Sequence, residues 1–379
     1  MSAIETIARL EHWLRPVLHT LPPHLAVRLF SDGRTAFAKA FADDVPQHAG
    51  FHAPSHMAVR AWGLEFSMPI WNAAGMFKNG EGYEVVARQG AGAYVAGTTT
   101  SVPRVGNVKD GIRWPAAAYP RSGVASNWMG LPNEGHAAVA ARLSALTRVA
   151  GCPVGASVSA DPGMDQNLAL PALAKGMRLY DRVGVDYIEL NESCPNVPGH
   201  DAQHDVLDAG LLQRLDYVAH HVLATRTRNL PVVVKFSTDT NPAYVDDLVR
   251  VLIERGFDGI ILGNTSTQYV AVRPLIDKRE QAVYDHFTRS FGGGLSGRPL
   301  RDVSLELCAR ARRAADACAP TREFHVIRCG GVSTAADIEA SRREGILLNQ
   351  WYVGYFDAFG VDGHNVYRRL AAQLVAMRT

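Results

Sequence analysis

The sequence is poor in the features that several classes of protein need. Five cysteines are scattered through 379 residues without CxxC spacing, which argues against a disulfide framework or a zinc site and fits a reducing cytoplasm. No apolar run reaches the ~18 residues of a membrane-spanning helix. Charged residues such as Glu5, Arg9 and Glu11 interrupt any signal-peptide core. A net charge of +2, with no lysine- or arginine-rich run, gives no indication of a nucleic-acid partner.

The N-terminal segment has the pattern of an amphipathic helix. Apolar residues recur at spacings of three and four over 4–21, and Pro22 and Pro23 end the pattern. A second apolar stretch follows at 25–30. Two interpretations stay open: helices packed on the main domain, or helices lying on a membrane surface. We therefore separate a helical segment, residues 1–45, from a main domain, residues 46–379.

The main domain alternates short apolar runs with helical stretches. The runs are rich in Val and Ile with little polar alternation, as expected for parallel strands buried on both faces. Eight strand–helix units in a row predict an α/β fold of the (β/α)8 TIM-barrel type. The eight runs are Pro69–Ala73, Ala93–Gly97, Val154–Val158, Asp186–Leu190, Val232–Phe236, Gly259–Gly263, Phe324–Ile327 and Ile346–Trp351. The clearest helical stretches are 134–148, 168–183, 242–255, 335–343 and 363–377.

In such a barrel the site forms where the strands end, so the residues at those ends indicate the chemistry. They are mainly amides, lysines, small hydroxyls and glycines, without a histidine cluster or a catalytic carboxylate pair. This argues against a metal site and against glycosidase chemistry. Converging Asn and Lys side chains suit a planar, polar, anionic ring. The glycines at 292–294, 297, 330 and 331 suit a phosphate.

Several motifs resemble those of the dihydroorotate dehydrogenase family, in order and at fitting spacing over about residues 60–370. They are WGLEFSMPIWNAAGMFKNGEG, GTTTSVPRVGN, SNWMGLPNEG, LNESCPNVPG, VVVKF, GNTST, FGGGLSGRPL and the CGG before the last strand. The resemblance implies an FMN-containing barrel that oxidises dihydroorotate to orotate. It assigns the ring to Lys78, Asn127, Asn191, Asn196, Asn264 and Thr265. It assigns FMN to Ala74, Thr98, Lys235, Gly297, Gly331, Tyr352 and Gly354.

The resemblance also implies the roles of two catalytic residues. Cys194 is the expected base that takes a proton from C5 of the ring, while C6 delivers hydride to flavin N5. Lys235 is expected to stabilise negative charge on the reduced flavin. Outside this motif, a lone cysteine is more often a small buried hydrophobe, and a strand-end lysine often extends to solvent.

The chain combines features of two classes within the family. Its helical extension at 4–40 and GGLSGRPL are typical of membrane-associated, quinone-using members, whereas Cys194, Val197 and Leu131 match the soluble members. Quinone is the expected acceptor, with a peripheral position on the cytoplasmic side of the cell membrane; a soluble acceptor such as fumarate is the alternative. The sequence departs from the family pattern at Ser157, at Asp110-Gly111 with Arg113 displaced, and at Arg328-Cys329. These departures leave two alternatives open: a paralogue that acts on a related cyclic amide, and a non-catalytic flavin-binding protein.

Overall fold

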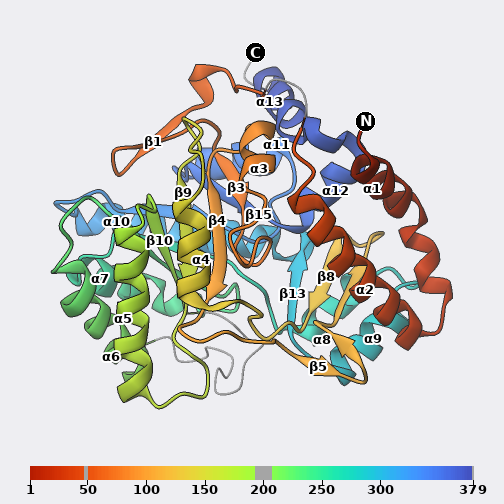
Figure 1. Cartoon of the computed structure of the whole chain (residues 1–379), viewed down its shortest axis with the longest axis horizontal. Coiled ribbons are helices and arrows are strands. Elements are labelled where there is room, and N and C mark those ends of the chain that lie inside the picture. Colours follow the sequence, from red (N-terminus) through yellow and green to blue (C-terminus); the bar gives the residue numbers. More distant parts are fainter. Residues whose placement is uncertain (47–49, 193–206, 378–379) are drawn as a thin grey trace.

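The computed structural model describes residues 1–46, 50–192 and 207–377. Its centre is an eight-stranded parallel sheet in which every predicted apolar run contributes a strand (Figure 1). The order around the sheet is β3-β15-β14-β12-β11-β10-β9-β4. Their bounds are β3 Ile70–Asn72, β4 Tyr94–Thr99, β9 Val154–Val158, β10 Tyr187–Asn191, β11 Val232–Phe236, β12 Gly259–Leu262, β14 His325–Arg328 and β15 Leu348–Trp351.

The first and last strands of this order, β3 and β4, meet through hydrogen bonds that nearly close the barrel. The Asn72 side chain donates to Val95 O at 2.8 Å, and Gly97 N donates to Phe77 O at 2.8 Å. Large side chains, including those of Trp71 and Tyr187, form a buried cluster with residues of the barrel strands. The hairpin of β1 Val59–Ala61 and β2 Leu64–Phe66 adds its own aromatic residues to the same cluster. The predicted TIM-type barrel is confirmed.

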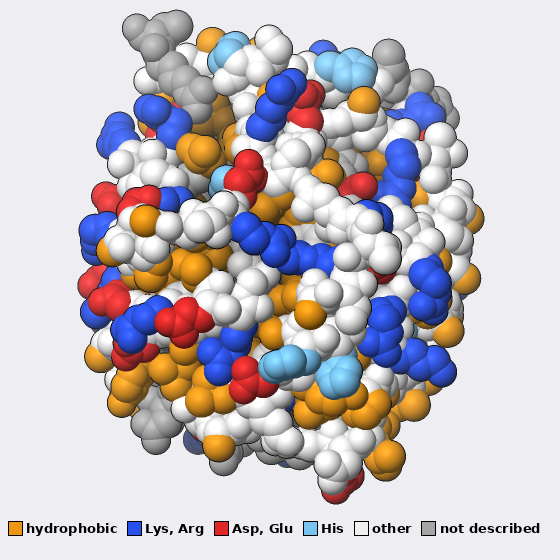
Figure 2. Space-filling model, turned by 90° about the vertical axis from the view of Figure 1, so that its left-hand side faces the viewer, with side chains coloured by type: hydrophobic (Ala, Val, Ile, Leu, Met, Phe, Trp, Pro, Cys, Tyr) orange, Lys and Arg blue, Asp and Glu red, His pale blue; other side chains and the backbone are white. Residues whose placement is uncertain are grey.

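Helices follow most strands and pack around the barrel. They include α3 Tyr83–Gln89, α4 Gly135–Ser144, α5 Gln166–Arg182, α6 Ala209–Val218, α7 Val245–Glu254, α10 Arg301–Cys318, α11 Ala335–Arg343, α12 Val353–Asp362 and α13 Val366–Ala376. The five predicted stretches match α4, α5, α7, α11 and α13, with ends that differ by a few residues. On the face over α5, α6, α7 and α10, side chains of both charges are interspersed with apolar ones (Figure 2).

The two long connections contain regular structure that the sequence did not predict. They build an antiparallel sheet of β7 Ala116–Tyr119, β8 Val124–Asn127 and β13 Gly294–Gly297, with β13 contributed from a distant part of the chain. The helices α8 Tyr269–Val272 and α9 Gln281–Ser290 come from the second connection, and α9 contacts this sheet. A short hairpin, β5 Val108–Lys109 with β6 Ile112–Arg113, lies at its edge.

The N-terminal segment forms two helices beside α12 and the extra sheet (Figure 1). Helix α1 spans Ala3–Leu14, a 3-10 turn spans Arg15–Thr20, and α2 spans Pro23–Ala42. The prediction of one helix over 4–21 was therefore wrong at its C-terminal end. Pro16 is the physical reason, because proline has no N–H for the helical ladder and its ring clashes with the preceding turn.

Candidate active site

A cavity of about 490 Å³ lies at the carboxyl ends of the barrel strands and continues outward between α1, α2 and α12. Its inner part is lined by strand ends and by β8 and β13. Its outer part is lined mainly by apolar side chains, among them Leu18, Phe30 and Phe37. One continuous space therefore joins the barrel interior to the N-terminal helices.

Most of the sequence-predicted site residues lie together in the wall of this cavity. These are Ala74, Lys78, Thr98, Asn127, Asn191, Lys235, Asn264, Thr265, Gly297, Gly331, Tyr352 and Gly354. Cys194 and Asn196 lie outside the described residues, so their predicted positions stay predictions. The fold thus brings together residues that are as far apart in the sequence as Ala74 and Gly354.

A chain of buried hydrogen bonds runs across the barrel beneath the cavity. The Asn191 side chain donates to Thr98 Oγ1 at 2.8 Å, and the hydroxyls of Thr98 and Ser157 are 2.9 Å apart. Ser157 in turn donates to Glu189 Oε1 at 3.1 Å. Because inward-facing residues alternate along a strand, Glu189 lies one layer below Asn191 on β10.

Lys235, on the neighbouring strand β11, is the last member of this network. Its side chain is 2% exposed and that of Glu189 is 0% exposed, with 3.4 Å between Lys235 Nζ and Glu189 Oε1. Gln350 joins both groups, since it accepts from Lys235 Nζ at 3.0 Å and donates to Glu189 Oε2 at 2.9 Å. The strand-end set taken from the sequence included neither Glu189 nor Gln350, so both are site residues that it missed. Inward alternation from Asn191 was the signal that could have identified Glu189.

Lys78 is the second lysine of the cavity and has a different environment. Its Nζ donates to Gly75 O at 2.9 Å, and the Glu81 carboxylate accepts from the backbone N–H of Lys78 and Asn79. Burial, with the Arg34 guanidinium adding to it and Glu81 opposing it, lowers the pKa of Lys78 to about 7. No carboxylate of the described residues forms a close ion pair with Lys78, so the carboxylate of a ligand can pair with its ammonium.

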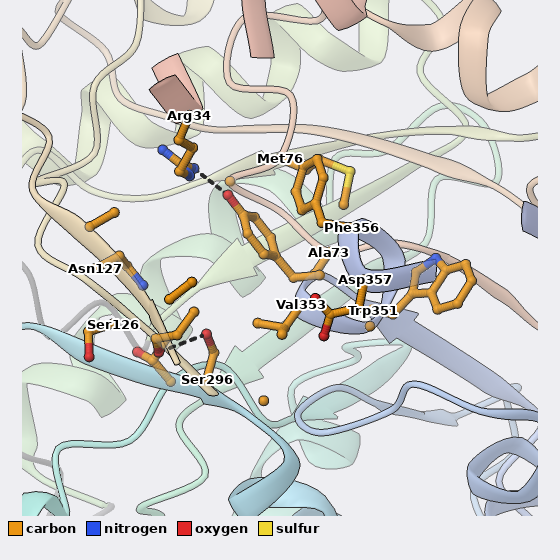
Figure 3. A pocket seen from close by; sticks show the side chains of 18 of the residues that line it. Arg34, Ala73, Met76, Ser126, Asn127, Ser296, Trp351, Val353, Phe356 and Asp357 are labelled. Carbon is orange, nitrogen blue, oxygen red and sulfur yellow. Dashed lines mark hydrogen bonds between the residues drawn. The ribbon is translucent and has the colours of Figure 1, made fainter. Parts of the chain in front are cut away.

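Arg34 was not predicted from the sequence and comes from α2. It donates to the Tyr352 hydroxyl, and its guanidinium carbon lies 5.9 Å from the centroid of that ring (Figure 3). Among the described residues no carboxylate lies within ion-pair distance of Arg34, in contrast to Arg15, which pairs with Glu11 and Asp357. The junction between the inner and outer cavity therefore carries a positive group that a ligand oxygen can use.

Glycines allow close approach between the segments at one end of the cavity. Gly331 has φ +75°, and a Cβ there would lie 2.4 Å from Arg301 N. A Cβ on Gly354 would lie 2.6 Å from Ser333 Cα. Helix α12 begins beside them, at Val353, without a side-chain cap. Its first N–H groups and the glycine backbone form a cradle suited to a phosphate.

The three departures from the family pattern lie in different places. Ser157 is part of the buried hydrogen-bond chain. Asp110 and Arg113 belong to the exposed β5–β6 hairpin, where Arg113 lies over the Trp114 ring. Arg328 is fully buried and donates to Ser304, Ser341 and the carbonyls of Asp337 and Arg301. Two of the three departures thus pack inside the protein.

The other polar groups of the cavity suit a ring with several oxygens. Thr265 lines the cavity, and its buried Oγ1 has no hydrogen-bond partner among the described residues. Asn127 is placed next to the cavity by the pairing of β8 with β13. In the part of the chain that the structure describes, no group of His, Cys, Asp and Glu could hold a metal ion.

Comparison with known proteins gives a consistent result. The family model described as dihydroorotate dehydrogenase matches residues 56–373. A relative from Chelativorans sp. (strain BNC1), named dihydroorotate dehydrogenase (quinone), is 30% identical over 96% of this chain and 90% of its own length. A relative of the same name from Methylococcus capsulatus is 30% identical over 91% of this chain and 94% of its own length.

A solved structure agrees on the fold. The dihydroorotate dehydrogenase of Eimeria tenella in complex with ferulenol has a TM-score of 0.73 and 21% identity, and the match covers 91% of this chain and 90% of that one. The family match spans the barrel strands and the residues of the inner part of the cavity, but not the N-terminal helices. The chain therefore belongs to the dihydroorotate dehydrogenase family of flavin-dependent oxidoreductases, which act on CH–CH bonds.

Proposed function

We propose that the protein oxidises dihydroorotate to orotate, a step of pyrimidine biosynthesis, with FMN as its flavin and a quinone as the electron acceptor. The observation that carries the proposal is the single cavity, which has ring-binding and flavin-binding candidates at its inner end and an apolar passage at its outer end. The curated relatives named as quinone-type enzymes support the same assignment.

The residues present fit FMN. The cradle at Gly331, Gly354 and the start of α12 suits a phosphate, and both glycines lie so close to a neighbouring backbone segment that a Cβ would clash with it. In this proposal Ala74, Thr98 and Gly297 contact the flavin, Tyr352 lies beside it, and the Lys235 ammonium faces its ring system. When bound, the flavin accepts a hydride at N5 and passes the two electrons to the acceptor.

The substrate is held by other groups of the same cavity. Lys78 binds the carboxylate of the ring, and Asn127, Asn191, Asn264 and Thr265 bind its amide groups. Asn196, which lies outside the described residues, is assigned to the ring by the resemblance alone. Cys194 removes the proton from C5 while the hydride leaves C6, so that the ring loses two electrons and two protons in all. The Thr265 hydroxyl, which has no hydrogen-bond partner within the described part of the chain, supports this assignment, because a bound ring oxygen would give it one.

The acceptor site lies between the N-terminal helices and the barrel. Apolar side chains of α1 and α2 suit an isoprenoid tail, and Arg34 with Tyr352 offers donors to a quinone oxygen. Within the proposal, residues 1–45 are the acceptor-binding and membrane-docking segment and residues 46–379 the FMN-binding barrel. The segment rests peripherally on the inner face of the cell membrane.

One anaerobic experiment tests the assignment. The full chain is purified, its visible spectrum is recorded, and L-dihydroorotate is added. We expect a yellow protein that bleaches and releases orotate. A yellow protein that stays yellow would move the substrate to a related cyclic amide, and a colourless protein that cannot be loaded with FMN would favour a non-catalytic role.

A further inference from the structure

Glu189 is a buried carboxylate that the proposed chemistry does not use directly. It lies on β10 with an exposure of 0%, in the layer below Asn191, and no part of it lines the cavity. Its two oxygens receive hydrogen bonds from Ser157 and Gln350 and lie near the Lys235 ammonium. A fully buried carboxylate costs much free energy unless it is paired, so its partner indicates its role.

Lys235 is surrounded by several groups, and one of them has a charge that can balance the ammonium. Gln350 on β15 and Asn191, its register neighbour on β10, are neutral. Cys329 follows β14, and burial raises the pKa of its thiol, so it is neutral near pH 7. Among the described residues packed around Lys235, Glu189 therefore supplies the anionic partner.

Two opposing effects act on the pKa of Lys235. Burial lowers it, whereas the neighbouring Cys329 and, after it, Glu189 raise it, and the net direction is a raised pKa. Because the Cys329 thiol is neutral near pH 7, the carboxylate at 3.4 Å is the neighbour that stabilises the ammonium there. Lys78 shows the contrasting case in the same cavity, because its carboxylate neighbour binds backbone N–H groups and its pKa falls to about 7. Without Glu189, Lys235 would be in a similar position to Lys78.

We propose that Glu189 is a positioning residue, which keeps Lys235 protonated and fixes its ammonium toward the flavin side of the cavity. This inference rests on the proposed function in one respect, namely that the flavin binds beside Lys235. Through Ser157 and Thr98 the same carboxylate is also connected to Asn191, a proposed ligand of the substrate. Its loss would thus alter the flavin environment without removing any group that touches the ring.

The first test needs no flavin. The full chain is treated with limiting acetic anhydride from about pH 6 to 10, and labelling of each lysine is followed by mass spectrometry, because only the neutral amine reacts. In the wild type we expect Lys235 to label at higher pH than Lys78, after correction for access using labelling at the highest pH. In Glu189→Gln we expect Lys235 to label at a pH lower by at least about one unit, since burial shifts lysine pKa values by up to ~3–5 units.

The second test uses the FMN-loaded protein. The reduction potential of the bound flavin is measured by equilibration with a reference dye over the same pH range. We expect the potential of Glu189→Gln to fall more steeply with pH than that of the wild type, because its Lys235 loses the proton within the range. The double variant with Lys235→Met should lose this extra dependence, and Glu189→Asp, which keeps the carboxylate, should largely restore the wild-type profile.

Asp258→Asn is the matched control, because Asp258 is also buried and paired with arginines but lies at the opposite end of the barrel. Asp258→Asn should lower the stability of the protein. It should leave unchanged both the pH profile of Lys235 labelling and the pH dependence of the flavin potential. Identical labelling of Lys235 in wild type and Glu189→Gln, or parallel potentials, would overturn the inference. If Glu189→Gln does not fold, the wild type alone still tests the inference: labelling of Lys235 at a lower pH than labelling of Lys78 would overturn it. A wild type that binds no FMN would sink the proposed function and leave the labelling result standing.

Discussion

The two lysines of the cavity show how strongly local partners decide a side chain's chemistry. Lys235 has a carboxylate at 3.4 Å and a raised pKa, whereas Lys78 has Arg34 as a charged neighbour and a pKa of about 7. The raised pKa of Lys235 suits a side chain that stays positively charged beside a flavin. The lowered pKa of Lys78 suits a side chain that becomes fully charged when an anion binds.

The pKa of Lys78 predicts a pH dependence of orotate binding. An anionic ring binds the protonated lysine, so its affinity should be highest below about pH 7. Above that pH the affinity should fall by up to about tenfold per unit, until the pKa of the complex is reached. The dissociation constant of orotate can be measured from the change in the flavin spectrum between about pH 6 and 9.

Lys78→Arg is the control for this profile, because a guanidinium stays charged over the whole range. Its orotate affinity should be weaker but nearly independent of pH. If wild type and Lys78→Arg show the same slope, another group titrates and the role of Lys78 is wrong.

At the scale of elements, α2 links the cavity to the N-terminal segment. It places Phe30, Gly33, Arg34 and Phe37 in the outer wall, while Arg28 on the same helix is exposed and donates to Asp110 O. Arg34 reaches Tyr352 at the end of β15. The helix thus brings a charged donor to the place where the acceptor would meet the flavin.

Substitution of Arg34 by Leu should affect the acceptor and spare the first half-reaction. Loss of a charged hydrogen bond costs about 1.5–3 kcal/mol, so the KM for a short-chain quinone should rise by roughly 10- to 100-fold. Below about pH 7, where Lys78 is protonated with or without Arg34, bleaching of the flavin by dihydroorotate should stay within about threefold. Arg28→Leu, which removes a charge from the same helix, should change neither the KM for quinone nor the rate of bleaching. A similar rise in KM for both variants would show that Arg34 is not part of the acceptor site.

At the scale of the whole molecule, the outer surface of α1 is unusually apolar. Ile7, Leu10 and Trp13 of α1 are 53, 55 and 74% exposed, and Val17 of the following 3-10 turn is 56% exposed. Ile7 also lines the outer part of the cavity. In the described part of the chain, no helix is long and apolar enough to cross a bilayer. Partial insertion of this surface is the form of membrane contact that we propose.

This arrangement predicts that Trp13→Glu and Leu10→Glu weaken binding to phospholipid vesicles. Each side chain contributes about 1.5–3 kcal/mol when it leaves water, so each change should lower the partition coefficient by roughly tenfold or more in a sedimentation assay. Turnover with a long-chain quinone in vesicles should fall in parallel, while turnover with a soluble dye is unchanged.

The control for this surface is Val270→Glu, because Val270 is 89% exposed on α8, away from α1. It should bind vesicles like the wild type. Equal loss of binding in all three variants, or none in any of them, would contradict docking through α1.

The sequence patterns predicted the strands of the barrel but did not predict the extra sheet of β7, β8 and β13. The eight core strands are continuous apolar runs, and such runs are buried as parallel strands whatever their neighbours are. Strands β7, β8 and β13 are made largely of Ala, Gly and Ser, and β13 pairs with a segment about 170 residues away, as in the pair Gly294 and Asn127. Their stability comes from packing and pairing, which a local window does not contain.

By itself, the sequence determined the barrel, its strand ends and the cavity residues carried by recognisable motifs. Strand patterns locate the barrel strands, and sites in such barrels form at the carboxyl ends of the strands, so neither step needs knowledge of other contacts. Only the tertiary structure decided that Glu189 faces Lys235, that Arg34 reaches Tyr352, and that the cavity continues between α1 and α2. Each of these depends on side chains from elements that are distant in the chain. Charge, pKa and access are set by such neighbours, and they exist only after the chain has folded.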